Sequence, residues 1–482
     1  MRKTYSIVGA AAGLSLALVS TAALADGDVY GPFPITVKGY SGKKTNSVAY
    51  TGQVARHVLH DSLKKLTYKG NGKPNPELKA KMMSYFKSKG KGRKIIAPKT
   101  KGPFVVKQTA VDDISKKKNI SGKTYKGAVA GMPNNMTGPE LLAFWIDKAS
   151  SAKKGVDWDN GFDYGQLISK FIMGAMKYNQ AVDNYLDEKL AADNKPNDKP
   201  YKKGAYYTGK EHSWDEGFGY FGAPAHALKL TPRQVYEITK QGSKSKPKSN
   251  AFKYADYNKD GKVDLKTEMT FSPAYYASGF DASVYDKSNG TKYLHTIVRA
   301  FIDGRKLITS AKGEKLSDAQ RAKLREYAAV IGSNWQKVLA EATYKYAGSV
   351  YKSMGKLKTI IEAKGNTKKE LRKYIKYWGE LKGFALALQT GRDNLGETAT
   401  RLNRMIGYGP LMPNLSQVKD IDSKGNYVRG QGSSWGEYML HMAKIQKLLV
   451  DKFGVQARNN AISGDLADLA KKLGGGKAVE ND

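Results

Sequence analysis

The sequence predicts an all-α fold of two tandem helical-bundle repeats joined by long irregular loops. From Leu324 to Tyr346, apolar residues recur every three or four positions, which is the spacing of one helix face. Capping boxes, in which Ser or Thr precedes Glu or Gln by three residues, occur at Ser317, Thr367 and Ser434. Strand-like alternation is confined to two three-residue stretches. In chain order, helices are expected over about residues 78–86, 164–190, 292–308, 317–346, 367–381 and 434–453.

Two short motifs occur twice with similar separations. Trp-x-Glu-x-x-Gly-aromatic begins at Trp214 and at Trp378, which are 164 residues apart. Lys-Tyr-x-x-x-Val begins at Lys177 and at Lys345, which are 168 residues apart. Near-equal separations favour duplication of one helical unit. A third Trp-x-Glu at 435–437 lacks the Gly, so the three-residue core alone is weak evidence.

The N-terminus has the pattern of an export signal. Arg2 and Lys3 precede an apolar run over 7–19, and an Ala-x-Ala site ends at Ala25, so we expect cleavage there. The chain contains no cysteine, which excludes a lipoprotein anchor, disulfides and thiolate metal sites. No later stretch approaches 18 uninterrupted apolar residues, so no membrane-spanning segment is expected.

The chain divides into segments of different composition. The expected segments are the signal peptide 1–25, a basic N-terminal segment with the first helix 26–135, a first helical repeat 136–240, an inter-repeat loop 241–289, a second helical repeat 290–455, and a C-terminal tail 456–482.

The positive charge is large and uneven. The formal net charge is +37, and loss of the two basic residues of the signal peptide leaves 37 − 2 = +35. Between Lys64 and Lys107 there are thirteen Lys and one Arg against a single acidic residue, Glu77. Such a field concentrates anions, which makes an anionic envelope polymer a candidate partner. The alternative is a role in solubility alone, because Lys is scattered through the whole chain. No nucleic-acid-binding module is recognisable, so nucleic acid is not an expected partner.

One segment combines an imidazole with two carboxylates. His212, Asp215 and Glu216 stand at positions i, i+3 and i+4, so on a helix both carboxylates approach the imidazole. This set suits iron or another divalent metal, or proton transfer by an oriented His. The alternative is an ordinary helix N-terminus, where acidic residues favour the helix dipole. The predicted ligand or metal cleft comprises His212, Trp214, Asp215, Glu216, Trp378 and Glu380, with both tryptophans buried.

A second segment fits the calcium-binding loop of EF-hands. It offers side-chain oxygens at positions 1, 3 and 5, Gly261 at position 6, and apolar Val263 at position 8. The closing carboxylate comes one residue late, at Glu268, so the exit from the loop is non-standard. The alternative is an Asx-rich surface turn. The predicted calcium ligands are Asp256, Asn258, Asp260, Lys262 through its carbonyl, Asp264 and Glu268.

Taken together, these motifs resemble an uncharacterised exported bacterial family, domain of unknown function 4856, related to the imelysin-like proteins. The likeness covers roughly Val48 to Phe453 and includes 212–216, 263–266, 301–305 and 378–384. The resemblance implies a two-bundle helical fold, export to the periplasm and a link with iron acquisition. The chain departs from the Gly-x-His-x-x-Glu signature of the imelysin-like proteins, since Lys210 replaces the Gly and Asp215 the Glu.

The sequence therefore predicts a non-catalytic, periplasmic binding or accessory protein linked to metal or iron uptake. One alternative is a metal-dependent hydrolase that uses His212, with Glu216 as the base. Another is a polyanion or cell-envelope binder that acts through Lys64–Lys107. Arg299 and Arg305 are candidate anion ligands. The simpler interpretation of Arg299 is a surface salt bridge with Asp303, four residues later on the same helix. Arg305 could reach an anion or the Glu380 carboxylate.

Overall fold

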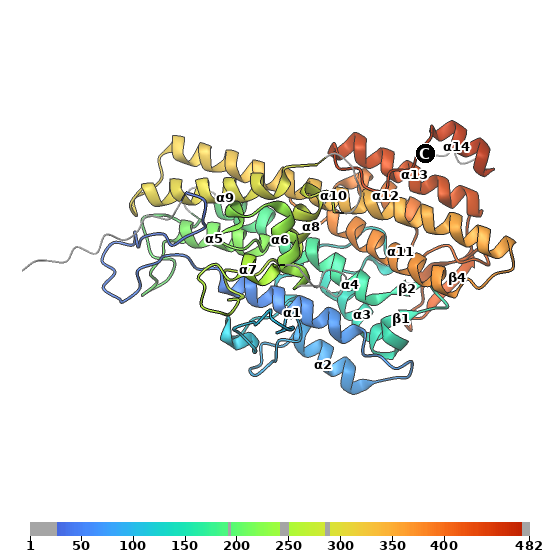
Figure 1. Cartoon of the computed structure of the whole chain (residues 1–482), viewed down its shortest axis with the longest axis horizontal. Coiled ribbons are helices and arrows are strands. Elements are labelled where there is room, and N and C mark those ends of the chain that lie inside the picture. Colours follow the sequence, from blue (N-terminus) through green and yellow to red (C-terminus); the bar gives the residue numbers. More distant parts are fainter. Residues whose placement is uncertain (1–26, 191–193, 242–249, 285–289, 475–482) are drawn as a thin grey trace, which may run out of the picture.

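The computed structural model describes residues 27–190, 194–241, 250–284 and 290–474. The fold is all-α, as predicted from the helical periodicity (Figure 1). The expected signal peptide lies outside the described residues. In the part of the chain that the structure describes, no helix is long and apolar enough to span a bilayer.

Strands are few and short. β1 (Val156–Asp157) pairs with β2 (Phe162–Asp163), and β3 (Ser416–Ile421) pairs with β4 (Tyr427–Gln431), both antiparallel. The alternating stretches 35–37 and 104–106 do not form strands, although Val106 makes an isolated parallel bridge to Val263. Three alternating residues are too few to specify a ladder without a partner strand.

Helix α10 (Asp318–Glu362) is the longest helix of the described residues. It packs against α9 (Tyr293–Ser310), α11 (Lys368–Leu388) and α13 (Trp435–Phe453). Figure 1 shows it running along much of the long axis of the molecule. The capping boxes predicted at Ser317 and Ser434 are present. The one predicted at Thr367 is not, because that residue already has helical backbone angles and its side chain does not cap.

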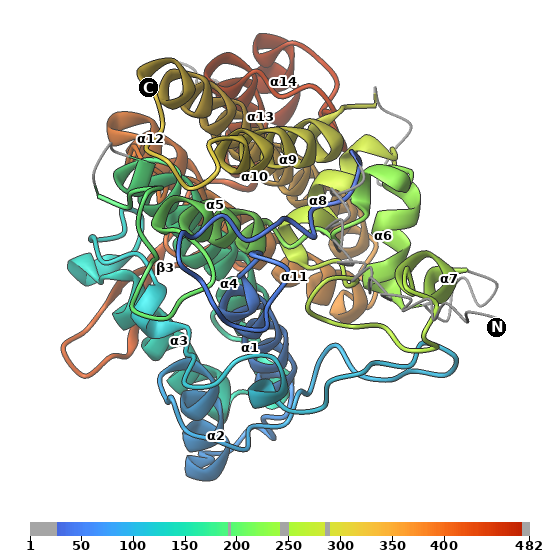
Figure 2. The same cartoon turned by 90° about the vertical axis from the view of Figure 1, so that its left-hand side faces the viewer.

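A second group of helices surrounds α1 (Thr51–Thr67), which is buried along most of its length. α1 contacts α2 (Pro76–Phe86), α4 (Tyr164–Ile172) and α5 (Gly209–Phe221). Figures 1 and 2 place α2 and α14 (Leu466–Leu473) at opposite edges of the molecule. The remaining helices are α3 (Gly138–Ser151), α6 (Pro232–Lys240), α7 (Ala251–Ala255), α8 (Ser272–Asp281) and α12 (Gly396–Ile406), with 3-10 turns at Val111–Asp113, Ser121–Lys123, Pro133–Asn135, Lys153–Gly155, Glu188–Leu190 and Ala227–Lys229.

The single helix expected over 164–190 is wrong in its second half. After α4 the chain continues as two π-helical stretches, Met173–Tyr178 and Gln180–Tyr185. Gly174 lies against the backbone of α11, where an added Cβ would approach the Ala387 carbonyl oxygen to 2.3 Å. Apolar spacing does not distinguish an α-helix from such widened turns, which are frequent at functional sites.

Candidate functional site

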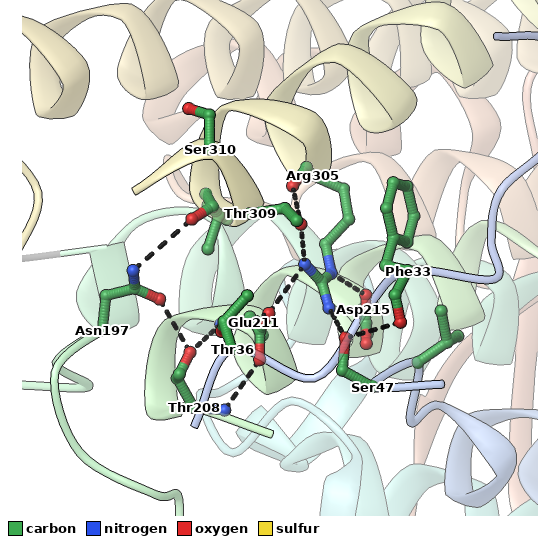
Figure 3. A network of polar contacts seen from close by, with 12 residues as sticks. Phe33, Thr36, Ser47, Asn197, Thr208, Glu211, Asp215, Arg305, Thr309 and Ser310 are labelled. Carbon is green, nitrogen blue, oxygen red and sulfur yellow. Dashed lines mark hydrogen bonds and ion pairs between the residues drawn. The ribbon is translucent and has the colours of Figure 1, made fainter. Parts of the chain in front are cut away.

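Arg305 of α9 lies at the centre of a buried ionic network (Figure 3). Its Nε donates a hydrogen bond to Asp215 Oδ1 at 2.9 Å, and one terminal nitrogen lies 3.1 Å from Glu211 Oε1. Both carboxylates come from α5, and all three side chains are inaccessible to solvent. Burial raises the pKa of the Asp215 carboxyl above its usual range, and the Arg305 charge opposes that shift.

The N-terminal segment completes this network. Tyr30 donates its hydroxyl to Asp215 Oδ1 at 2.7 Å, and the Ala49 N–H donates to the other oxygen at 2.9 Å. Arg305 also donates to Ser47 Oγ at 2.6 Å. The Asp215 carboxylate is therefore held by protein donors. The expectation that Arg305 reaches Glu380 is corrected, because its guanidinium is engaged by α5.

A close helix crossing explains why the charges meet there. Trp214 is fully buried, as predicted, and its Nε1 donates to the Phe301 carbonyl at 2.8 Å. An added Cβ on Gly304 would lie 2.1 Å from the Trp214 ring. Only glycine allows this approach of α9 to α5, and the approach brings Arg305 over the carboxylates.

His212 and Glu216 lie in different surroundings from Asp215. His212 Nε2 lies 3.7 Å from Glu216 Oε2, which confirms the contact expected from the i, i+4 spacing. The imidazole stacks on the ring of Tyr207, with centroids 4.5 Å apart, and meets the ring of Tyr201 edge-on at 4.3 Å. Gln53 donates to Glu216 Oε1 at 2.6 Å. Burial lowers the pKa of the His212 imidazole, which favours its neutral form.

Glu380 of α11 occupies a third environment. Tyr346 of α10 donates to Glu380 Oε1 at 3.1 Å, and the ammonium group of Lys170 lies 3.7 Å from the same oxygen. Oε2 is buried and has no hydrogen-bond partner among the described residues. Trp378, two residues earlier, is fully buried as predicted and donates to the Tyr438 hydroxyl at 2.9 Å.

The predicted metal cleft is corrected by these positions. Asp215 is bound to Arg305, Glu216 to Gln53 and His212, and Glu380 to Tyr346 and Lys170. Within the described ranges, no group of three or more His, Asp and Glu side chains is arranged to hold a metal ion. The i+3 and i+4 positions of α5 diverge because Asp215 points towards α9, whereas Glu216 points towards α1.

Lysines gather around Glu380. In what we call the Glu380 cluster, six lysines accompany three carboxylates, and one of these carboxylates, Asp163, is engaged by Arg372 at 2.8 Å. Neighbouring lysine charges act on one another there in addition to the effect of burial. The members are Asp61, Lys64, Asp163, Lys170, Lys177, Lys240, Lys345, Lys376 and Glu380.

Burial changes the protonation of these lysines. Burial, together with a smaller effect of the nearby Lys170 charge, lowers the pKa of Lys64 and Lys177 to about 7. It also lowers the pKa of Lys345 to about 8. Lys177 is fully buried, whereas Lys64 and Lys345 keep partial exposure, so the cluster reaches solvent. Perturbed ionisable groups gathered in one place are typical of functional sites.

Aromatic rings line the same cluster. The Lys170 ammonium lies 5.2 Å from the centroid of the Tyr276 ring and 5.7 Å from that of Phe384. The Tyr276 hydroxyl is 3.4 Å from that of Tyr346, which continues the hydrogen-bonded chain to Glu380. These rings stabilise ammonium groups by cation–π attraction but cancel none of their charge.

The predicted calcium loop is ordered by its own backbone. Gly261 N–H donates to Asp256 Oδ2 at 3.1 Å, and Lys262 N–H donates to Asp260 Oδ1 at 2.9 Å. Glu268 is buried and accepts from three backbone N–H groups, including that of Asp264 at 2.7 Å. The observed role of Glu268 is thus to tie the two ends of the loop.

A lysine also contacts this loop. The ammonium of Lys107 lies 3.2 Å from Asp260 Oδ2, and Gln108 donates to Asp264 Oδ1 at 2.7 Å. Of the predicted ligands, Asn258 accepts from the Asp260 N–H at 2.9 Å. The loop therefore has the turns of a cation-binding loop, with an ammonium group beside one of its carboxylates.

The other candidate anion ligands lie on the surface. Arg299 forms an ion pair with Asp28 at 2.5 Å and donates to the Gly27 carbonyl. The expected partner was Asp303. The basic stretch 64–107 places most of its lysines on the exposed side of α2 and the loops around it. Two of its lysines are paired, Lys79 with Asp147 and Lys107 with Asp260.

Comparison with known proteins supports the family resemblance for part of the chain. Residues 147–236 match a family described as a domain of unknown function (DUF4856). This range contains Lys170 and Lys177 of the Glu380 cluster, and also His212 and Glu216. No curated protein and no solved structure matches the chain.

Proposed function

We propose that this protein binds a hydroxylated anion at the Glu380 cluster and serves as a binding or accessory protein. The observation that carries the proposal is the surplus of lysines over carboxylates around a buried Glu380 whose Oε2 lacks a hydrogen-bond donor. Like charges gathered at low dielectric repel one another, and each also loses hydration. A bound anion relieves both effects.

The glutamate narrows the class of ligand. A buried carboxylate oxygen without a donor is costly, so the ligand should carry a hydroxyl or acid proton as well as negative charge. Hydrogen phosphate and hydroxycarboxylates such as citrate have both properties. A bare divalent cation is disfavoured, because its charge would add to that of the surrounding lysines.

This ligand class is compatible with a link to iron uptake. Hydroxycarboxylates form anionic complexes with ferric iron. A lysine-rich site would attract such a complex, although it would repel the free ferric ion. The link itself rests on the resemblance to the imelysin-like proteins, and periplasmic export rests on the pattern of residues 1–25. We therefore place the protein among binding or accessory proteins for anionic metal complexes.

The test is titration calorimetry of the mature chain with citrate, inorganic phosphate and ferric citrate. Lys170→Met keeps the length of the side chain and removes the charge, and Glu380→Gln replaces the acceptor by an amide. Both substitutions should weaken binding at least tenfold. Lys369→Met removes an exposed charge from α11, the helix that carries Glu380, and should not weaken binding. Circular dichroism would establish that the variants are folded. Absence of binding, or equal weakening by Lys369→Met, would overturn the proposal.

The exposed lysines around α2 favour a second candidate, the binding of an anionic envelope polymer. That binding would depend on many weak charge contacts, so it should fall steeply with salt and resist any single substitution. The test is binding of heparin as a model polyanion. Binding that is lost at about 0.5 M NaCl, where exposed charges are largely screened, and that is unchanged in Lys170→Met would support this candidate.

A further inference from the structure

A second group of cations surrounds Glu216. We call it the Glu216 cluster; beyond Gln53, His212 and Glu216 it contains Arg56, Lys118, Lys123, Tyr185 and Lys189. The Lys189 ammonium lies 4.2 Å from the centroid of the Tyr185 ring, and Lys123 lies 3.4 Å from the Tyr185 hydroxyl. Burial lowers the pKa of Lys123 to about 8, and the Arg56 charge adds to this shift.

In the described part of the chain, these cations lack a carboxylate within ion-pair distance. Arg56 is buried and donates to the carbonyls of Asn119 and Gly52, at 3.0 and 3.1 Å. Neither it nor the three lysines of the cluster forms an ion pair with a carboxylate of the described residues. Glu216 is the carboxylate whose charge acts on all three lysines.

The two clusters correspond in sequence and in space. Glu216 and Glu380 are each the third residue of a Trp-x-Glu motif whose tryptophan is fully buried. Helix α1 runs past both, with Gln53 and Arg56 in its first half contributing to one cluster, and Asp61 and Lys64 in its second half contributing to the other. In each, a central glutamate accepts hydrogen bonds from neutral donors, Gln53 and Tyr185 for Glu216 and Tyr346 for Glu380, and lies among lysines and tyrosines.

We propose that the Glu216 cluster is a second binding site for the same class of small hydroxylated anion, so that one chain binds two equivalents. This inference rests on the proposed function of the Glu380 cluster. Arg56, Lys123 and Lys189 would supply the positive charge, and Glu216 would accept the proton or hydroxyl of the ligand. The site differs from the first in its wall, where His212 contacts the rings of Tyr201 and Tyr207.

His212 provides a direct readout, because the chain has six histidines and their ring signals can be assigned one by one. Titration with inorganic phosphate, followed by NMR of the imidazole carbons and protons, should shift the His212 signal. The signal of His295, which bonds to the Leu230 carbonyl at 2.9 Å on another face, should stay in place. Calorimetry of the wild type should give two equivalents of phosphate.

Variants separate the two sites. The double variant Lys123→Met/Lys189→Met should abolish the His212 shift and leave one equivalent of phosphate, bound at the Glu380 cluster. Lys170→Met should keep the His212 shift and remove the equivalent bound at the Glu380 cluster. The matched control is Lys199→Met, an exposed lysine of the preceding loop, which should keep both. If the wild type binds a single equivalent of phosphate without a shift of the His212 signal, and Lys170→Met removes that equivalent, this inference is overturned and the proposed function still stands. Absence of any phosphate or citrate binding would overturn both.

Discussion

Arg305 and Asp215 form an ion pair at 2.9 Å in which neither side chain is accessible to solvent. The pair joins α9 to α5, and through Tyr30, Ser47 and Ala49 it also fixes the N-terminal segment onto the helices. Residues far apart in the sequence thus meet at one guanidinium group. A network with its donors and acceptors satisfied in this way supports the fold.

The first prediction concerns the stability of this network. Arg305→Met should lower the free energy of unfolding by about 3–5 kcal/mol, because it leaves Asp215 and Glu211 buried without their counter-ion. Arg305→Lys should also destabilise, since an ammonium cannot reproduce the planar fork of contacts. Urea denaturation followed by circular dichroism measures both. Arg299→Met removes an exposed arginine from the same helix and should cost less than about 1 kcal/mol; equal losses for Arg305 and Arg299 would contradict the network's role.

The second prediction concerns pH and stability. Lys382 is fully buried, donates to the carbonyls of Gly131 and Gly407 at 2.7 and 2.8 Å, and has a pKa that burial lowers to about 7. The unfolded lysine keeps its ordinary, higher pKa, so unfolding takes up a proton above pH 7. The free energy of unfolding should therefore rise with pH from 7 towards 10, by up to about 1.4 kcal/mol per pH unit for each such lysine.

Denaturant titrations at pH 7 and pH 8.5 measure this slope. Lys382→Met should reduce the rise between the two pH values by up to about 2 kcal/mol. Lys369→Met, which removes an exposed lysine from the same helix, should leave the rise unchanged. An identical slope in the wild type and in Lys382→Met would show that Lys382 remains charged in the folded protein.

The third prediction concerns pH and ligand binding. Lys64 and Lys177 have pKa values near 7, so at pH 8.5 both are largely neutral in the free protein. An anion binds their charged forms, and binding must therefore take up protons. Citrate is mostly trianionic at pH 7 and gains slightly more negative charge by pH 8.5, yet its affinity should fall by up to about tenfold per pH unit for each proton taken up.

Calorimetry in two buffers of different ionisation enthalpy measures the proton uptake directly. Lys64→Met and Lys177→Met should each reduce the uptake. A citrate affinity that stays constant between pH 7 and 8.5, with no uptake, would mean that these lysines remain charged without a ligand or do not face it.

Local sequence patterns predicted the helices, the burial of Trp214 and Trp378, and the contact between His212 and Glu216. These features depend on spacing within one helix, which periodicity reports. The partners of Asp215 and Glu380 could not be predicted in the same way. They are set by which helix packs on which, and a carboxylate pattern that suits a metal suits an arginine or a lysine equally well.

The lysines of the Glu380 cluster were missed for a related reason. Lys64 and Lys170 stand in ordinary helical sequence, where lysine is expected on the exposed face. The repeated Lys-Tyr motif at Lys177 and Lys345 was the available signal, because both of its lysines enter the cluster. Lys177 lies in the first π-helical stretch after α4, and no spacing rule indicates such a stretch.

The fourth prediction concerns calcium at the loop 256–268. Its Asx turns match those of a calcium loop, but the Lys107 ammonium lies beside Asp260 and opposes a divalent cation. Calcium should therefore bind weakly to the wild type and raise its melting temperature only at high concentration, because a ligand specific to the folded state stabilises that state. Lys107→Met should increase this gain at a given calcium concentration, and Asp260→Ala should abolish it.

Differential scanning fluorimetry with calcium, and with magnesium as the control ion, measures these shifts. Lys101→Met removes an exposed lysine from the same basic loop and should leave the calcium response as it is in the wild type. If Lys107→Met gains nothing from calcium, the carboxylates of the loop do not converge on an ion even when the competing charge is gone. Asp256, Asp260 and Glu268 would then serve to hold the turn through backbone N–H groups, the role in which their hydrogen bonds already place them.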